Sequence, residues 1–266
     1  MRSVEWGLAY WMGRVFEAEP PIYEFTARAG RAGGAESELR SAFAGLPYMR
    51  CYVGGESGLG GGVEGNGRQG RWQGGGLAEF EDESVPTALW PGTLAEVSEL
   101  GRTMAETYRV LRPGGLLMVS VPLNRAIDAD GADSWRLTPE CVARTLNGYG
   151  ASVVGYQGYE RFPHTVVGVA IKEPVPRDFA ERARRIEAEL QGWLADERRA
   201  LGLWERLMLA AGRLHPSRNR RVMTADRYRV KFTIWSAGTR CQEPEWRRAA
   251  VGPVGSNSER LVVRRA

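Results

Sequence analysis

The spacing of apolar residues along the chain predicts strands that alternate with helices. Short runs rich in β-branched and aromatic residues predict strands at 22–25, 48–53, 85–90, 116–122, 151–157, 166–171 and 228–235. Apolar residues three and four positions apart predict helices at 1–16, 37–43, 94–111, 138–146 and 177–212. The run 116–122 is almost entirely apolar, as in a strand covered on both faces of a sheet. This order of elements predicts an α/β domain.

Several boundaries follow from local signals. Residues 112–115 (Arg-Pro-Gly-Gly) are expected to end the helix 94–111, since proline cannot continue it. Thr138 and Pro139 suit the N-cap and first position of the next helix. Gly192 and Gly202 weaken the stretch 177–212, so we expect bends or two helices there. The Pro-Val-Pro sequence at 174–176 divides the chain into an α/β domain, 1–173, and a helical, Arg-rich extension, 174–266.

Residues 54–76 form a glycine-rich segment. Twelve of these 23 residues are glycine, and large apolar side chains are almost absent, so the segment cannot supply a core. We expect a mobile loop; a phosphate-binding loop would need a Gly-Lys-Ser/Thr sequence that is missing here. Pro86 and Pro91 bracket the strand predicted at 85–90, and each removes a donor from a strand that is expected to be central.

Charge is unevenly distributed over the chain, whose net charge is +4. Residues 174–266 hold 20 basic and 11 acidic residues, whereas the preceding part is net acidic. A tail for an acidic partner and a solvated Arg-rich surface both fit this bias; we favour the second and do not expect nucleic acid as a partner. With no apolar run of about 18 residues, we expect no membrane partner. Three cysteines without paired spacing predict no metal and a reduced, cytoplasmic protein.

Three stretches together resemble one enzyme family. These are residues 108–122, where a helix leads through Arg-Pro-Gly-Gly into an apolar strand, residues 124–139 (N-R-A-I-D-A-D-G-A-D-S-W-R-L-T-P), and residues 158–169. They resemble the class I S-adenosylmethionine-dependent methyltransferases of the type 11 kind, over roughly residues 15–172. The resemblance implies a Rossmann-like three-layer sandwich that binds S-adenosylmethionine at the carboxyl ends of its first strands.

The resemblance also locates the cofactor positions, and these are replaced in this chain. After Glu24, where the family pattern has Gly-Ser, this chain has Phe25-Thr26-Ala27, and the β-branched Thr26 does not readily adopt positive φ. Tyr52 stands where the family has the aspartate for the ribose hydroxyls, a contact worth about 1.5–3 kcal/mol. Gly92 replaces a further aspartate. We therefore predict a degenerate cofactor site that binds S-adenosylmethionine weakly or not at all.

The resemblance places substrate-facing residues at Asn124, Trp135 and Arg136. In an active enzyme, His164 or Asp133 would be the catalytic base, since histidine titrates near neutral pH. The alternatives are structural: a hydrogen-bonding histidine, and an ion pair with a packed tryptophan.

Our preferred hypothesis is a non-catalytic subunit or binding module, paired with an active homologue or with itself as a homodimer. The setting implied by the resemblance is a glycan or secondary-metabolite pathway. The alternative is an active S-adenosylmethionine-dependent methyltransferase that acts on a sugar or a small hydroxylated metabolite. Trp193 and Trp204, in the stretch 177–212, could form a docking surface, but we expect them to pack on the α/β body.

Overall fold

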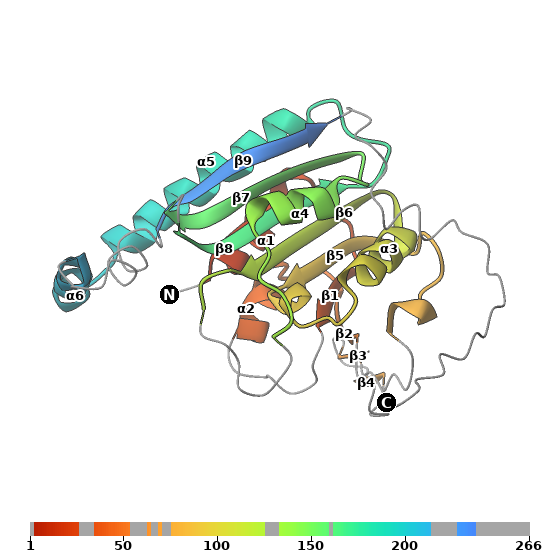
Figure 1. Ribbon diagram of the computed structural model, residues 1–266, viewed down its shortest axis with the longest axis horizontal. Coiled ribbons are helices and arrows are strands. Elements are labelled where there is room, and N and C mark those ends of the chain that lie inside the picture. The colour runs from red at the N-terminus through yellow and green to blue at the C-terminus, as the bar shows by residue number, and fades with distance from the viewer. Residues whose placement is uncertain are drawn as a thin grey trace, which may run out of the picture.

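The computed structural model describes residues 3–26, 35–53, 63–64, 69–70, 76–125, 133–159, 162–213 and 228–237. Their strands form one mixed sheet with helices on both faces (Figure 1). The strands are β1 (Ile22–Thr26), β2 (Tyr48–Tyr52), β3 (Val63–Glu64), β4 (Gln69–Gly70), β5 (Val85–Pro91), β6 (Leu111–Pro122), β7 (Ala151–Tyr159), β8 (Phe162–Ile171) and β9 (Val230–Ala237). Their order across the sheet is β4-β3-β2-β1-β5-β6-β8-β7-β9.

The order and direction of the strands define the fold. Strands β2, β1, β5 and β6 are parallel, and the order reverses between β1 and β5. Strand β8 runs antiparallel between β6 and β7. A doubly wound parallel sheet with such an inserted antiparallel strand is the Rossmann-like class I methyltransferase fold, which confirms the predicted fold class.

Helices cover the two faces of the sheet and close two apolar cores. The helical elements are α1 (Val4–Val15), α2 (Ala35–Ala42), η1 (Gly76–Glu79), η2 (Thr93–Ala95), α3 (Leu100–Val110), α4 (Pro139–Leu146), α5 (Phe179–Arg199) and α6 (Leu203–Arg213). One core lies under α1, α2 and α5, and the other under η1, η2, α3 and α4. The hydroxyl of Thr138 caps α4 by accepting a hydrogen bond from the Cys141 backbone, as its sequence predicts.

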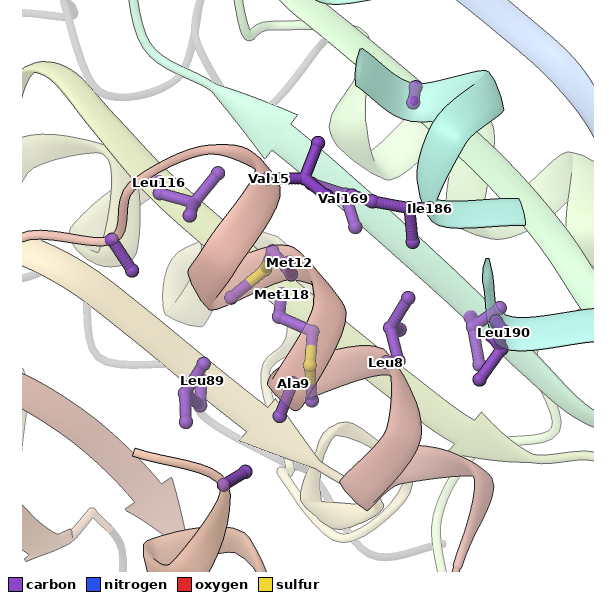
Figure 2. Close-up of a cluster of buried hydrophobic side chains, with 14 of the residues drawn as sticks. Leu8, Ala9, Met12, Val15, Leu89, Leu116, Met118, Val169, Ile186 and Leu190 are labelled. Atoms are coloured by element: carbon purple, nitrogen blue, oxygen red, sulfur yellow. The ribbon is translucent and has the colours of Figure 1, made fainter. Parts of the chain in front are cut away.

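Strand β6 contributes to both cores. Leu117 and Val119 belong to the core under α3 and α4, whereas Leu116 and Met118 face α1 and α5. This alternation follows from the two-residue period of a strand. Figure 2 shows part of the core under α1, α2 and α5. Its side chains come from α1 (Leu8, Ala9, Met12, Val15), from α5 (Ile186, Leu190) and from the strands (Leu89, Leu116, Met118, Val169).

The C-terminal elements are part of the same body. Strand β9 pairs antiparallel with β7, and the inner side of α5 is buried in the core that also holds α1. The Gln191 side chain joins α5 to β9, since it donates to the carbonyl of Tyr228 and accepts from the amide of Val230. The predicted boundary at 173/174 therefore marks a change in sequence character, whereas α5 and β9 share one core with the α/β domain.

The helix predicted at 94–111 is wrong in its first half. Leu94 lies in the short η2, and α3 begins only at Leu100. Leu94 and Val97 are nonetheless buried, so the apolar spacing is real although an irregular segment carries it. The helix ends at Val110, ahead of the glycine pair, and Gly114 has the positive φ of 72° that glycine tolerates.

Three other expectations have mixed outcomes. Pro86 lies within β5, which is nonetheless a central strand. The pairing of β5 with β6 shifts register between Val85 and Thr87, at the proline. The glycine-rich segment contains β3 and β4, while 54–62, 65–68 and 71–75 lie outside the described residues. The stretch 177–212 is two helices that separate around Gly202.

The two tryptophans of that stretch differ in their surroundings. Trp193 packs against Trp6 of α1, with ring centroids 5.8 Å apart, as expected. Trp204 is 73% exposed, so the prediction that it packs on the body is wrong. Among the described helices, none is both long enough and apolar enough to cross a membrane.

Replacement of Leu190 by alanine tests whether α5 belongs to the core. Leu190 is fully buried, so Leu190→Ala should lower the free energy of unfolding by about 2–5 kcal/mol. The exposed Arg185 on the same helix is the matched control, and Arg185→Ala should change it by less than about 0.5 kcal/mol. Chemical denaturation followed by circular dichroism measures both. If α5 were an independent extension, Leu190→Ala would leave the main unfolding transition unchanged.

Candidate functional site

The candidate site lies at the carboxyl ends of β1, β2, β5 and β6. The order of the strands reverses between β1 and β5, and ligands of open α/β sheets bind at such a reversal. Thr26 and Tyr52 end β1 and β2, Gly92 follows β5, and Pro122 ends β6. The segments 27–34 and 126–132, which follow β1 and β6, lie outside the described residues, as does the side chain of Tyr52.

The turn after β5 is held by its neighbours on both sides. The amide of Gly92 donates to the carbonyl and hydroxyl oxygens of Ser120 on β6, at 2.8 and 3.0 Å. The hydroxyl of Thr93 donates to the carbonyl of Phe25 on β1, at 3.0 Å. Gly92 has φ 72°, and a Cβ there would meet nothing within 4 Å, so its conformation rather than crowding favours glycine. The turn is thus fixed across the strand reversal.

Glu24 lies within the sheet and faces the α1 and α2 layer. Its carboxylate accepts a hydrogen bond from the hydroxyl of Tyr48 at 2.5 Å and lies 3.6 Å from Nε of Arg50, its partner in the β1–β2 register. Glu24 is only 2% exposed, and burial raises its pKa although Tyr48 and Arg50 oppose the shift. Its carboxylate is therefore occupied by neighbouring strands rather than presented at the strand end.

Phe25 fills the opposite face of β1. It is fully buried, with its ring centroid 5.2 Å from that of Trp90 and 5.6 Å from that of Phe80. Thr26 is also buried, and its carbonyl accepts a hydrogen bond from the amide of Val53 at 2.7 Å. At the two positions where the resemblance implies a glycine-serine turn, the chain therefore continues its sheet and its core.

Asp133 forms the centre of an ion-pair network. It accepts two hydrogen bonds from the guanidinium of Arg136, and Nη2 of Arg125 lies 3.4 Å away. Arg125 also lies 3.7 Å from the carboxylate of Glu96. The Asp133 side chain is 3% exposed, and the hydrogen bonds from Arg136 lower its pKa to about 2. A carboxylate with so low a pKa is a weak base, so this geometry favours the structural interpretation of Asp133 and Arg136.

Trp135 attaches this segment to the turn after β5. The amides of Ser134 and Trp135 donate to the carbonyl of Ala95 at 2.8 and 3.0 Å, and the Trp135 indole donates to the carbonyl of Val97 at 2.7 Å. The ring remains 37% exposed, so one part of it is available at the surface.

Asn124 and His164 lie together where β6 and β8 meet. The Asn124 side chain donates to the carbonyl of Pro163 at 2.9 Å, and its backbone amide donates to the carbonyl of His164 at 3.2 Å. Nδ1 of the half-buried His164 lies 2.8 Å from the hydroxyl of Thr165. Arg125, which follows Asn124, connects this pair to Asp133. The structure thus gathers Asn124 with His164, and Asp133 with Arg136.

Sequence reasoning missed Arg125, which connects these groups. Its partners Glu96 and Asp133 come from two different segments, and no periodic pattern relates them. The only available signal was the position of Arg125 directly after Asn124, in the stretch that carries the family resemblance. Within the described ranges, no three histidine, cysteine or acidic side chains gather so as to hold a metal ion.

Among known proteins, this chain is similar to solved structures. No protein-family model matches the sequence. No curated protein matches it either. Solved structures similar to this chain include an S-adenosylmethionine-dependent methyltransferase from Thermotoga maritima (14% identity, 63% of this chain and 93% of that one, TM-score 0.36). Another is the Burkholderia thailandensis 1,6-didemethyltoxoflavin-N1-methyltransferase with bound S-adenosylhomocysteine. The similarity has 19% identity and a TM-score of 0.43, and it covers 62% of this chain and 78% of that one. The fold assignment rests on the strand order described above.

Titration of Asp133 should be visible as a pH-dependent stability. Its pKa is lowered to about 2 in the folded protein and is about 3.9 in an unfolded chain. The stabilisation is therefore complete above about pH 5 and is lost as the pH falls toward 2. We expect Asp133→Asn to destabilise the protein at neutral pH, and the difference from the wild type to shrink as the pH falls from about 6 to 3.

Urea denaturation across this pH range measures the difference, with Glu140→Gln as the control. Glu140 forms an exposed ion pair with Arg144, so its removal should have little effect at any pH. A difference between Asp133→Asn and the wild type that stays constant with pH would contradict the proposed ion pairing.

Proposed function

We propose that this chain is a methyltransferase-fold protein whose S-adenosylmethionine site is degenerate, and that it acts as a non-catalytic subunit or binding module. One observation carries the proposal: at the strand reversal, the described polar groups are bonded to one another. The hydroxyl of Thr93 donates a hydrogen bond to the carbonyl of Phe25. The carboxylates of Glu96 and Asp133 both form ion pairs with Arg125. A nucleoside ligand would have to compete with these contacts.

The residues present do not fit S-adenosylmethionine. Close approach of the methionine portion to the end of β1 needs a residue without a side chain, whereas Phe25 and Thr26 are buried here. The ribose hydroxyls need a charged acceptor at the end of β2, where the chain has Tyr52. Glu24, the nearest carboxylate on β1, is held by Tyr48 on the α1 and α2 side.

The proposed role requires a partner or a ligand of another kind. A catalytically active homologue fits a non-catalytic subunit, and a homodimer is the simplest alternative. The proposed setting, a glycan or secondary-metabolite pathway in the cytoplasm, rests on analogy at the level of the fold. The competing function is an active methyltransferase on a small hydroxylated metabolite or sugar. His164 supports it, since a half-buried imidazole on β8, beside the end of β6, could accept the proton of an acceptor hydroxyl.

Ligand titration distinguishes these two functions. We expect S-adenosylmethionine and S-adenosylhomocysteine to give no saturable heat by calorimetry and no thermal shift up to millimolar concentration. A ligand present at a hundred times its dissociation constant would stabilise the fold by about 2.7 kcal/mol, so binding would be easily seen. ATP serves as the control for unspecific nucleotide effects.

A saturable isotherm for S-adenosylmethionine or S-adenosylhomocysteine, with none for ATP, would overturn the degenerate site. Activity toward hydroxylated acceptors would then be compared between the wild type and His164→Ala, to identify the catalytic base.

A further inference from the structure

Helix α6 presents an apolar face that no other described element covers. Leu203, Trp204 and Leu207 are 77%, 73% and 52% exposed, respectively. Figure 1 shows α6 beyond the end of α5, away from the sheet, and α6 makes extensive contact with no other described element. Large exposed aliphatic and aromatic side chains that lie together indicate a surface that is covered in use.

The three side chains share one side of the helix. At 100° per residue, positions 203, 204 and 207 fall within a sector of about 100°, which is the width of a typical apolar stripe. Arg206 lies outside this sector, and its guanidinium donates to the carbonyl of Arg199 at the end of α5. Arg198 and Arg199 are also exposed. The apolar face is therefore bordered by positive charge.

The sequence of this region is net positive. Residues 196–221 contain seven arginines and three acidic residues, a net charge of +4, and Arg199 is paired with Asp196. An exposed helix with leucine and tryptophan on one side, within a cluster of basic residues, is the combination that attracts anionic lipid headgroups and buries its apolar side among them.

We propose that α6 is a membrane-surface anchor, which inserts Leu203, Trp204 and Leu207 into an anionic lipid surface while the surrounding arginines contact the headgroups. The lack of an apolar segment long enough to span a membrane predicts no spanning helix. A helix that lies in the interface needs no such segment. The anchor is independent of the cofactor site, since it lies outside the sheet.

A second copy of the chain fits these features less well. Two helices of this length, each about 16 Å, would bury roughly half of the ~1,200 Å² that a stable interface needs. The neighbouring strand β9 is an edge strand within the described part of the sheet, but its pairing with β7 shifts register around Thr233. Lys231 is exposed on the same strand. A bulge and a lysine are features that prevent pairing between edges.

Vesicle co-sedimentation of the full-length protein tests the proposal. Vesicles of phosphatidylcholine with phosphatidylserine should bind the wild type, vesicles of phosphatidylcholine alone should bind it much less, and raised salt should weaken the binding. The double variant Trp204→Ser/Leu207→Ser should bind at least about tenfold more weakly, because both buried side chains are removed. The control is Trp235→Ser, which removes a partly exposed tryptophan from β9 and should bind like the wild type.

The outcomes separate the possible occupants of this surface. Circular dichroism of each variant confirms that the fold is intact, which we expect since the substituted side chains of α6 are exposed. Equal binding of the wild type and the double variant, or no binding to the anionic vesicles, would overturn the proposal. If the vesicles do not bind, two further measurements identify what covers this surface instead. A dimer in analytical ultracentrifugation that the double variant loses would indicate a second copy, and salt-sensitive binding to single-stranded DNA would indicate a nucleic acid.

Discussion

The burial of β6 on both faces is the constraint on which the other elements depend. Leu117 and Val119 need one apolar layer, and Leu116 and Met118 need a second on the opposite side. A strand with this composition is stable only between two sets of helices. Helices α3 and α4 supply the first layer. Helices α1 and α5 together form the second layer. This explains why the described C-terminal elements share this core although the composition of the C-terminal part differs.

The polar residues at the strand ends follow from this constraint. With the strand interiors fixed by packing, polar side chains gather where the strands end, and there they must find partners. The Asp133 side chain is 3% exposed and is held by Arg136 and Arg125, whose side chains are 29% and 28% exposed. Removal of one member of this network would leave the charge of another without its partner. The described polar groups at the strand reversal thus largely pair with each other.

The sequence predicts those parts of the structure that depend on local pattern. The apolar run of β6 and the Thr138–Pro139 helix start are such cases, because period and capping are local properties. The spacing of Leu94 and Val97 predicts a helix where the structure has none, because periodicity records burial and not backbone conformation. The ion pairs of Arg125 could not be predicted, since Glu96 and Asp133 reach it only after α3 and β6 have folded. The exposed Trp204 shows the same limit: an apolar stripe on a helix does not reveal whether anything covers it.

Phe25 connects the proposed degeneracy of the cofactor site to the stability of the fold. It occupies a position where the family resemblance implies glycine, and its fully buried ring packs against Trp90 and Phe80. Truncation of such a ring costs about 3–5 kcal/mol, which is a large part of the 5–15 kcal/mol that stabilises a typical domain. The side chain that stands where the resemblance implies a small residue is thus part of the core. A change to glycine at this position would be costly unless the aromatic cluster were repacked, so the fold itself favours retention of the aromatic residue.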